Sequence, residues 1–245
     1  MMTASTSESV AKAGCARCVM RGLGLCRLLI DLGSEKPFPN AQRPFGQEKK
    51  WVAARRPVIQ RKEFIDGVPV LCEGWALRML RLSNGRRQIL SFLLPGEMLA
   101  AELIFKQQVD FSIEAITSIC FRTFERPQLR AAMLASGELF DTIFSAYSDE
   151  KSKAEQLIAD LGRRTATERV ARLLLDIWDR SEKLGMVKGN RIEFPLRQSH
   201  IADATGLTQV YVSKVLGNFR KSGLVQIRGR TLEIADMTKL RRLVA

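Results

Sequence analysis

The stretch Phe194 to Ile234, FPLRQSHIADATGLTQVYVSKVLGNFRKSGLVQIRGRTLEI, carries the strongest structural signals in the chain. Its first part predicts a short helix that ends at Gly206, because glycine adopts the left-handed conformation of a helix end most easily. Thr208 then suits the N-cap of a second helix, whose inward residues recur at helical spacing. Those inward residues are Val212, Val215, Leu216 and Phe219. The stretch therefore predicts a helix-turn-helix.

The second of these helices keeps an outward face near its N-terminus. After Gly223 the segment LVQIRGRTLEI alternates apolar and polar residues, which predicts a two-stranded wing with Arg228 and Arg230 at its tip. A helix fits the major groove of DNA with its first turns against the base edges, and arginines suit phosphates. The residues expected to contact DNA are Thr208, Gln209, Val210, Tyr211, Ser213, Lys214, Arg228 and Arg230.

The charge of the C-terminal third supports this interpretation. A helix-turn-helix corner by itself also occurs in small helical domains that do not bind DNA. From Arg163 onward, however, 17 Lys or Arg face 8 Asp or Glu, so this part carries +9 of the formal net charge of +13. Such a basic region is typical of a surface that binds phosphates.

The whole chain has the composition of an ordinary soluble protein. Its 245 residues, 46% hydrophobic and 27% charged, suffice for one large or two modest domains. The apolar runs fall short of the roughly 20 residues that cross a bilayer, and the start lacks a signal-peptide pattern, so we expect a cytoplasmic protein without a membrane partner. Five cysteines, crowded toward the N-terminus, do not resemble a secreted disulfide framework.

Four regions follow one another along the chain, and together they predict an α+β fold. Residues 1–50 form a cysteine-containing N-terminal segment, and residues 51–126 hold short strand-like runs separated by turn signals, which suggests a β-roll. Residues 127–164 are helical, and residues 165–245 form the winged helix-turn-helix. We expect the three tryptophans, Trp51, Trp75 and Trp178, to fill cores.

The helical region contains a candidate dimer seam. Residues recur every seven positions at Phe140, Tyr147, Ala154 and Leu161, with Ile143 and Leu157 between them and Glu150 at the remaining intermediate position. A helix that packs only on its own domain would give a similar pattern. A charge at the seam would make self-association weaker.

The phrase GWALRMLRLSNGRRQILSFLLPGE, residues 74–97, followed by a long helix and a winged helix, resembles the CRP/FNR family of bacterial transcription regulators, in particular its FNR/FixK-like branch. Its most specific parts are residues 84–88, 95–97 and 162–170 together with the helix-turn-helix. The resemblance implies a cyclic-nucleotide-binding-like β-roll, a dimerisation helix, a homodimer on an inverted repeat of double-stranded DNA, and RNA polymerase as a partner.

Two positions depart from the patterns of that family. Cyclic-nucleotide members hold the ligand phosphate with an Arg-Ser pair where this chain has Phe111-Ser112, so we expect no cyclic AMP. In the recognition helix, Val210 and Lys214 stand where glutamate and arginine are commonest, which indicates a different DNA half-site.

The cysteines suggest a sensory input. Cys15-x-x-Cys18 and Cys26 supply three thiolates, and Cys120 stands where the resemblance implies the fourth ligand of an iron–sulfur cluster of the 4Fe–4S type. Buried thiols, structural zinc and a thiol redox switch are the alternatives. Cys72, in VPVLCEGW, is interpreted as an ordinary buried strand cysteine.

The sequence therefore predicts a DNA-binding regulator that responds to oxygen or redox state. The alternatives are a regulator with no metal cofactor, whether thiol-based, bound to another small ligand or constitutive, and more remotely an enzyme. Against an enzyme, no Gly-rich phosphate loop, nucleophile–histidine pair or carboxylate cluster at catalytic spacing is present. The sole histidine, His200, is expected to contact solvent or phosphate and not a metal.

Overall fold

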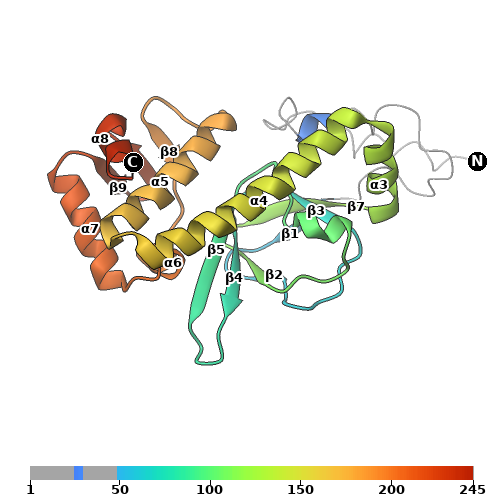
Figure 1. Cartoon of the computed structure of the whole chain (residues 1–245), viewed down its shortest axis with the longest axis horizontal. Helices are drawn as coiled ribbons and strands as arrows, with labels where there is room; N and C mark the ends of the chain where they lie inside the picture. Colours follow the sequence, from blue (N-terminus) through green and yellow to red (C-terminus); the bar gives the residue numbers. More distant parts are fainter. Residues whose placement is uncertain (1–24, 30–48, 245) are drawn as a thin grey trace, which may run out of the picture. The chain divides into compact units, whose positions relative to one another are not determined.

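The computed structural model describes residues 25–29 and 49–244, and Figure 1 labels most of their helices and strands. Two cysteines of the predicted cluster, Cys15 and Cys18, lie outside the described residues. The N-terminal strands are β1 (Lys50–Val52), β2 (Pro57–Ile59), β3 (Val68–Glu73), β4 (Ala76–Arg81), β5 (Arg87–Leu93), β6 (Ser112–Ala115) and β7 (Ile119–Phe124), with a 3-10 helix, η2 (Ala101–Ile104), between β5 and β6.

The N-terminal strands form two sheets, with orders β1-β7-β3 and β2-β6-β4-β5. Strand β7 pairs antiparallel with both β1 and β3. All seven of these strands but β1 lie wholly within the region 51–126 that the sequence marks as strand-like, and Gly85 and Gly96 occupy turns at positive φ. The predicted β-roll is therefore confirmed.

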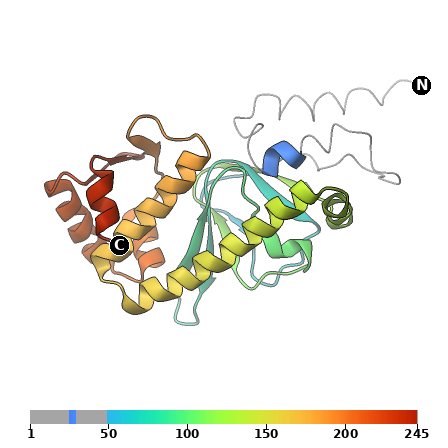
Figure 2. The same cartoon turned by 45° about the horizontal axis from the view of Figure 1, so that its top comes forward.

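Residues 25–29 form a short helical segment beside the start of helix α4 (Figure 2). Leu25 and Leu28 enter the same hydrophobic core as Leu139 of that helix. Arg27 donates a hydrogen bond to Glu138. Packing on one shared core thus fixes both helices on the roll.

The tryptophans do not all lie in cores. Trp75 and Trp178 are 1% and 5% exposed, as expected. Trp51 is 61% exposed, so the expectation for this residue is wrong. Its strand β1 is the edge of the sheet β1-β7-β3, and one face of an edge strand can remain in solvent.

The helical region that follows the roll consists of two helices, α3 (Arg126–Ala135) and α4 (Gly137–Arg163), where the sequence suggested one over 127–164. Ser136 interrupts them with an extended backbone, φ −132° and ψ 107°. Its hydroxyl accepts a hydrogen bond from the Leu139 amide at 3.3 Å, which satisfies one of the free N–H groups of the new helix.

The C-terminal part is a winged helix-turn-helix with one strand more than predicted. Its sheet has the order β8-β10-β9, and β8 pairs Ile192 with Leu232. Three residues are too few to show an alternating pattern, which is why the sequence predicted only two strands. Its elements are α5 (Ala166–Lys183), β8 (Arg191–Glu193), α6 (Gln198–Thr205), α7 (Gln209–Lys221), β9 (Val225–Arg228), β10 (Thr231–Ile234) and α8 (Met237–Arg242).

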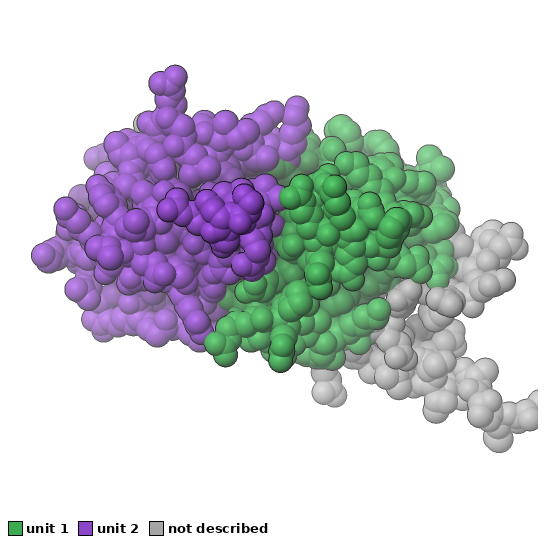
Figure 3. Space-filling view, turned by 90° about the horizontal axis from the view of Figure 1, so that it is seen from below, with its two compact units in different colours: residues 1–76, 93–150 green, residues 77–92, 151–245 purple. Residues whose placement is uncertain are grey.

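The chain divides into two compact units, coloured separately in Figure 3. One comprises residues 1–76 and 93–150, and the other comprises residues 77–92 and 151–245. The hairpin of β4 and β5, residues 77–92, therefore groups with the winged helix and not with the rest of the roll. No helix in the described part of the chain is long and apolar enough to cross a membrane.

Candidate functional site

The turn between α6 and α7 has the geometry that the sequence predicts. Gly206 ends α6 in the left-handed region with φ 67°, and the Leu207 amide donates to the Ala202 carbonyl at 3.0 Å. A Cβ atom at position 206 would lie 3.0 Å from Leu161 Cδ2. Glycine is thus required both for the backbone conformation and for the close approach of Leu161.

Helix α7 buries one face and exposes the other. The Thr208 hydroxyl caps it by accepting from the Tyr211 amide at 3.2 Å. Val212, Val215 and Phe219 are buried, as predicted, and Leu216 is half-buried. The residues predicted to read bases are all exposed, and Val210 is the most notable at 81%. They are Gln209, Val210, Tyr211, Ser213 and Lys214. An exposed valine at the start of a capped helix is free to meet a base edge.

The wing carries its two predicted arginines on an exposed turn. Gly229 lies between them with φ 58°, which allows the tight reversal from β9 to β10. Arg230 Nη2 donates to Glu193 Oε1 at 3.0 Å, so its charge is already paired. Both arginines are exposed, so both can reach a phosphate.

The end of α4 and the start of α5 support the helix-turn-helix through arginines. Arg169 donates from Nη1 to the Thr205 carbonyl at 3.2 Å and from Nε to the Arg164 carbonyl at 2.9 Å. Asp160 accepts from Arg164 at 3.0 Å and from Arg172 at 3.1 Å. This network fixes α6 relative to the end of α4.

The hairpin of β4 and β5 also contacts α6, a contact that no local sequence pattern predicts. Arg87 forms an ion pair with Asp203, and both side chains are mostly buried. Gln88 Nε2 donates to the Ala204 carbonyl at 3.1 Å. Arg180 Nη2 donates to the Phe92 carbonyl at 2.6 Å. The hairpin is therefore tied to α6, the first helix of the helix-turn-helix.

His200 has a structural place near this tie. Its Nδ1 accepts from the Arg197 amide at 3.2 Å, where α6 begins. Burial, with the positive charges of Arg87 and Arg197, lowers the pKa of His200 from 6.5 to about 4, although Asp203 acts in the opposite direction. At neutral pH His200 is uncharged and its Nδ1 holds a helix start, while the side chain keeps partial exposure to solvent.

Part of the predicted dimer seam lies on an exposed face of α4. Four large side chains on this helix are exposed: Phe140 at 45%, Phe144 at 59%, Tyr147 at 46% and Ile158 at 73%. Together with exposed Ala154 they follow the alternating spacing of four and three that places residues on one helix face. We call these five residues the α4 stripe.

Two residues of the predicted seam, Ile143 and Leu157, are not on the exposed face of α4. Ile143 is 2% exposed and lies in the core of its own domain, so it cannot reach a second chain. Leu157 is half-buried, and the exposed neighbours Phe144 and Ile158 take the intermediate positions instead. Leu161 is half-buried against Gly206. Glu150 does not belong to the α4 stripe. The position between Tyr147 and Ala154 on that face is Lys151.

Of the four predicted cluster ligands, the structure describes Cys26 and Cys120. Cys26 is half-buried against the roll core, and Cys120 is fully buried in β7. Within residues 25–29 and 49–244 no group of three or more His, Cys, Asp or Glu could hold a metal ion. Any cluster would thus need Cys15 and Cys18. Thiolates are the donors that iron–sulfur clusters use, so the chemistry of the donor set fits.

Charged groups surround the Cys120 thiol. Burial raises its pKa, with the Glu73 carboxylate acting in the same direction, while Lys49, Arg122 and the Cys72 thiol act against it. Burial also acts to lower the pKa of Lys49, but the hydrogen bond with Glu73 and the nearby negative charges outweigh burial, so that this pKa is raised. Lys49 therefore remains a cation beside Cys120.

The position of the missing phosphate-binding arginine is occupied by an apolar side chain. Phe111 packs against the roll core, and the Ser112 hydroxyl accepts from the Arg61 amide at 3.1 Å. Neither residue offers a cationic donor to a phosphodiester.

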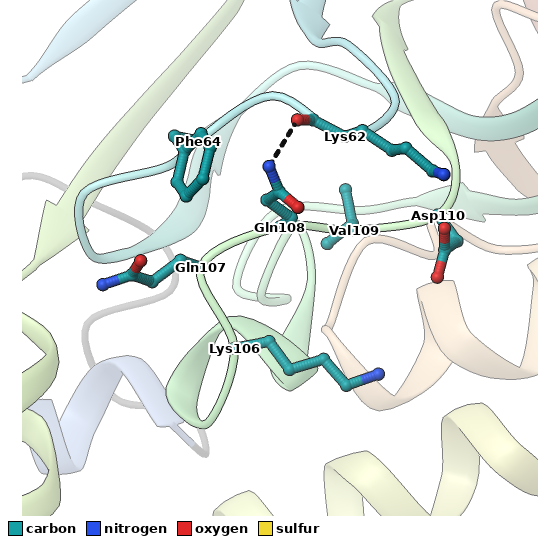
Figure 4. Close-up of a pocket in the computed structure, with 7 residues that line it drawn as sticks. All are labelled: Lys62, Phe64, Lys106, Gln107, Gln108, Val109 and Asp110. Carbon is teal, nitrogen blue, oxygen red and sulfur yellow. Dashed lines mark hydrogen bonds between the residues drawn. The ribbon is translucent and has the colours of Figure 1, made fainter.

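A shallow hollow of about 510 Å³ lies nearby on the same unit (Figure 4). Figure 4 shows Gln108 reaching toward the main chain of Lys62, where its Nε2 donates to the carbonyl at 2.9 Å. The hollow contains none of the predicted site residues. Its lining residues are Lys62, Phe64, Lys106, Gln107, Gln108, Val109 and Asp110.

Two family models match this chain, one in its N-terminal part and one in its C-terminal part. A family model described as the cyclic nucleotide-binding domain matches residues 49–136, and one described as the Crp-like helix-turn-helix domain matches residues 168–243. The nitrogen fixation regulation protein FixK of Rhizobium meliloti (strain 1021) is 34% identical over 170 residues, which cover 69% of this chain and 74% of FixK.

Two further relatives cover more of the chain. The transcriptional activatory protein AadR of Rhodopseudomonas palustris is 28% identical over 230 residues, which cover 93% of this chain and 92% of AadR. The solved structure of FixK2 from Bradyrhizobium japonicum superposes with a TM-score of 0.71 at 26% identity and covers 81% of this chain and 97% of FixK2. None of these three relatives is named as an enzyme.

Proposed function

The chain belongs to the CRP/FNR family of transcription regulators, and we propose that it acts as a homodimer that binds an inverted repeat in double-stranded DNA. It is a DNA-binding regulator and not an enzyme. The observation that carries the proposal is the first turn of α7, which is capped by Thr208, buried on one side and open to solvent on the other. A two-fold dimer would present two such helices to successive major grooves.

The exposed groups of α7 define what kind of half-site it can read. Gln209 and Lys214 can donate hydrogen bonds to purine acceptors, and Val210 can contact a thymine methyl group. Valine accepts no hydrogen bond from a base amine, and lysine lacks the bidentate fork of arginine. We therefore propose a half-site that differs from the one commonest in this family.

The α4 stripe supports the dimer. Phe140 and Phe144 stack with ring centroids 6.0 Å apart on the surface, and exposed apolar residues along one face of a 27-residue helix favour pairing with a second copy. RNA polymerase is the partner proposed for the DNA-bound dimer, on the strength of family membership.

Selection from a pool of random-sequence duplexes tests the proposal. Enriched sequences should be palindromic, with half-site centres about one helical turn apart. Sedimentation of the complex should give two chains per duplex. Enrichment of an asymmetric single half-site, or one chain per duplex, would contradict the dimeric arrangement.

For the sensory input, we propose an oxygen-labile iron–sulfur cluster of the 4Fe–4S type held by Cys15, Cys18, Cys26 and Cys120, with no cyclic AMP bound. Such a cluster would supply a redox-sensitive link between the N-terminal segment and the roll. Cys120 supports this role because it is a buried sulfur donor at a fixed place on a strand. Phe111 at the phosphate position supports the exclusion of a cyclic nucleotide.

Anaerobic purification tests this input. The protein should be brown and contain iron and acid-labile sulfide, and it should lose both colour and high-affinity DNA binding in air. Cys120→Ser should be colourless from the outset, whereas Cys72→Ser should keep the cluster. Stoichiometric zinc without sulfide, or no metal after anaerobic reconstitution, would contradict the cluster and leave the DNA-binding assignment intact.

A further inference from the structure

Cys72 and Cys120 lie beside each other on neighbouring strands. In the antiparallel pair of β3 and β7, Leu71 faces Phe121 and Glu73 faces Cys120. The register shifts between Leu71 and Glu73, so that Cys72 is the extra residue of a bulge opposite Cys120. The two thiols make a side-chain hydrogen-bond contact. In a bulge, two residues of one strand oppose a single residue of the other, so Cys72 and Glu73 both face Cys120.

The two thiols of the pair differ in their access to solvent. Cys120 is fully buried, whereas Cys72 is half-buried and therefore open to a small reagent. Lys49 Nζ lies 3.2 Å from Glu73 Oε1, and its charge interacts with both cysteines. The second strand beside Cys120 is β1, where exposed Trp51 is its partner.

We infer that Cys72 and Cys120 form a redox-active dithiol, which a hydroperoxide converts into a disulfide between β3 and β7. Cys72 reacts first: its thiolate attacks the peroxide, the O–O bond breaks, and Cys72 becomes a sulfenic acid while hydroxide leaves. The Cys120 sulfur then attacks Cys72 Sγ. The S–S bond forms, the S–O bond breaks, and the departing hydroxide takes up a proton as water. In total, two thiols and one hydrogen peroxide give one disulfide and two waters.

This pair gives Cys72 a role that the sequence did not suggest, and it competes with the proposed cluster for Cys120. A Cys120 sulfur in the disulfide cannot ligate iron, because a metal ligand must be a thiolate. The disulfide would therefore prevent the cluster from reassembling until a dithiol reductant restores both thiols. The inference itself rests on the register of β3 and β7 and does not depend on the cluster.

A variant that retains only these two cysteines tests the pair directly. Cys15→Ser, Cys18→Ser and Cys26→Ser together leave two of the five cysteines in the full-length chain. After reduction and removal of metal, an equimolar amount of hydrogen peroxide should remove both thiols as counted with a chromogenic disulfide reagent. A dithiol reductant should restore both. On a non-reducing gel the protein should stay a single chain. Adding Cys72→Ser to this variant should abolish the reversible loss of two thiols.

Peptide mapping of the metal-free wild-type protein provides a second measurement that does not depend on the folding of the variant. Trypsin should release residues 63–78 and 107–122 as separate peptides, each with one cysteine. After peroxide treatment and alkylation of free thiols, the two peptides should be joined, with a mass two hydrogens below their sum. A link to Cys26, a link between chains, or separate oxidised peptides would overturn the inference.

Discussion

Lys214 is the single residue of α7 whose removal should change base recognition most. It is exposed on the first half of the helix, where a side chain can reach a base edge. Lys214→Ala should weaken binding to the selected site on the order of tenfold and change binding to random DNA much less. Titration of labelled duplexes measures both affinities.

Lys221 provides the matched control for this substitution. It is an exposed lysine in the last turn of the same helix, away from the end expected to enter the groove. Lys221→Ala should affect the two duplexes equally. If Lys214→Ala also affected them equally, the reading face would be wrongly assigned.

His200 should make the stability of the protein depend on pH. Its pKa is lowered from 6.5 to about 4 in the folded chain, so the unfolded chain binds more protons between these values. The stabilising contribution of neutral His200 is therefore complete above pH 6.5 and is lost as the pH falls toward about 4. Urea unfolding at a series of pH values should show a flatter profile for His200→Gln. Identical pH profiles of the two proteins would exclude this role.

At the scale of the element, the proposed dimer depends on one helix face, the α4 stripe. Ile158 is 73% exposed, and two copies of a charged side chain facing each other across an apolar seam would repel and lose solvation. Ile158→Glu should shift the protein from dimer to monomer in sedimentation equilibrium.

Leu134 is the matched control because it is 89% exposed on α3, outside the stripe. Leu134→Glu should leave the dimer intact. A dimer of unchanged affinity in Ile158→Glu would place the interface elsewhere.

The hairpin of β4 and β5 should stabilise the first helix of the DNA-binding motif through the ion pair of Arg87 and Asp203. Both side chains are mostly buried, so the pair is screened less than a surface pair. In a double-mutant cycle, Arg87→Ala and Asp203→Ala should show a coupling on the order of 1 kcal/mol in the free energy of unfolding. The control pair is Gln226, which is half-buried, and Lys239, which is exposed, both elsewhere in the same unit. Their alanine substitutions should have additive effects on the free energy of unfolding.

For the whole molecule, the net charge of +13 should make DNA binding strongly dependent on salt. Lysines and arginines that neutralise phosphates displace condensed counterions, so that the logarithm of the affinity falls linearly with the logarithm of the salt concentration. Arg228→Ala should weaken binding to specific and random duplexes alike. It should also reduce the slope of log affinity against log salt concentration by about the amount expected for one phosphate contact per chain. Arg230→Ala should act less, because Glu193 already pairs with it. An effect of Arg228→Ala confined to the selected site would contradict a phosphate contact.

Local signals made the elements predictable. Gly206, Thr208 and the buried series of α7 each act through residues a few positions away, so their roles are visible in the sequence. The register of the seam was not predictable, because Ile143 and Phe144 are equally apolar and only the packing of α4 on the roll decides which one is buried. Trp51 was mistaken for a core residue for the same reason.

The sequence by itself determined the order of β-roll, long helix and winged helix-turn-helix, together with the exposed reading face and the basic charge of the C-terminal third. These properties depend on periodicity, capping and composition, which act over short distances along the chain. Only the tertiary structure decided that Cys72 lies opposite Cys120, that Arg87 meets Asp203, and that Phe144 and Ile158 face outward. The first two contacts join residues far apart in the sequence, and the third property depends on which face of the helix is buried. Both are determined by how side chains pack in the folded chain.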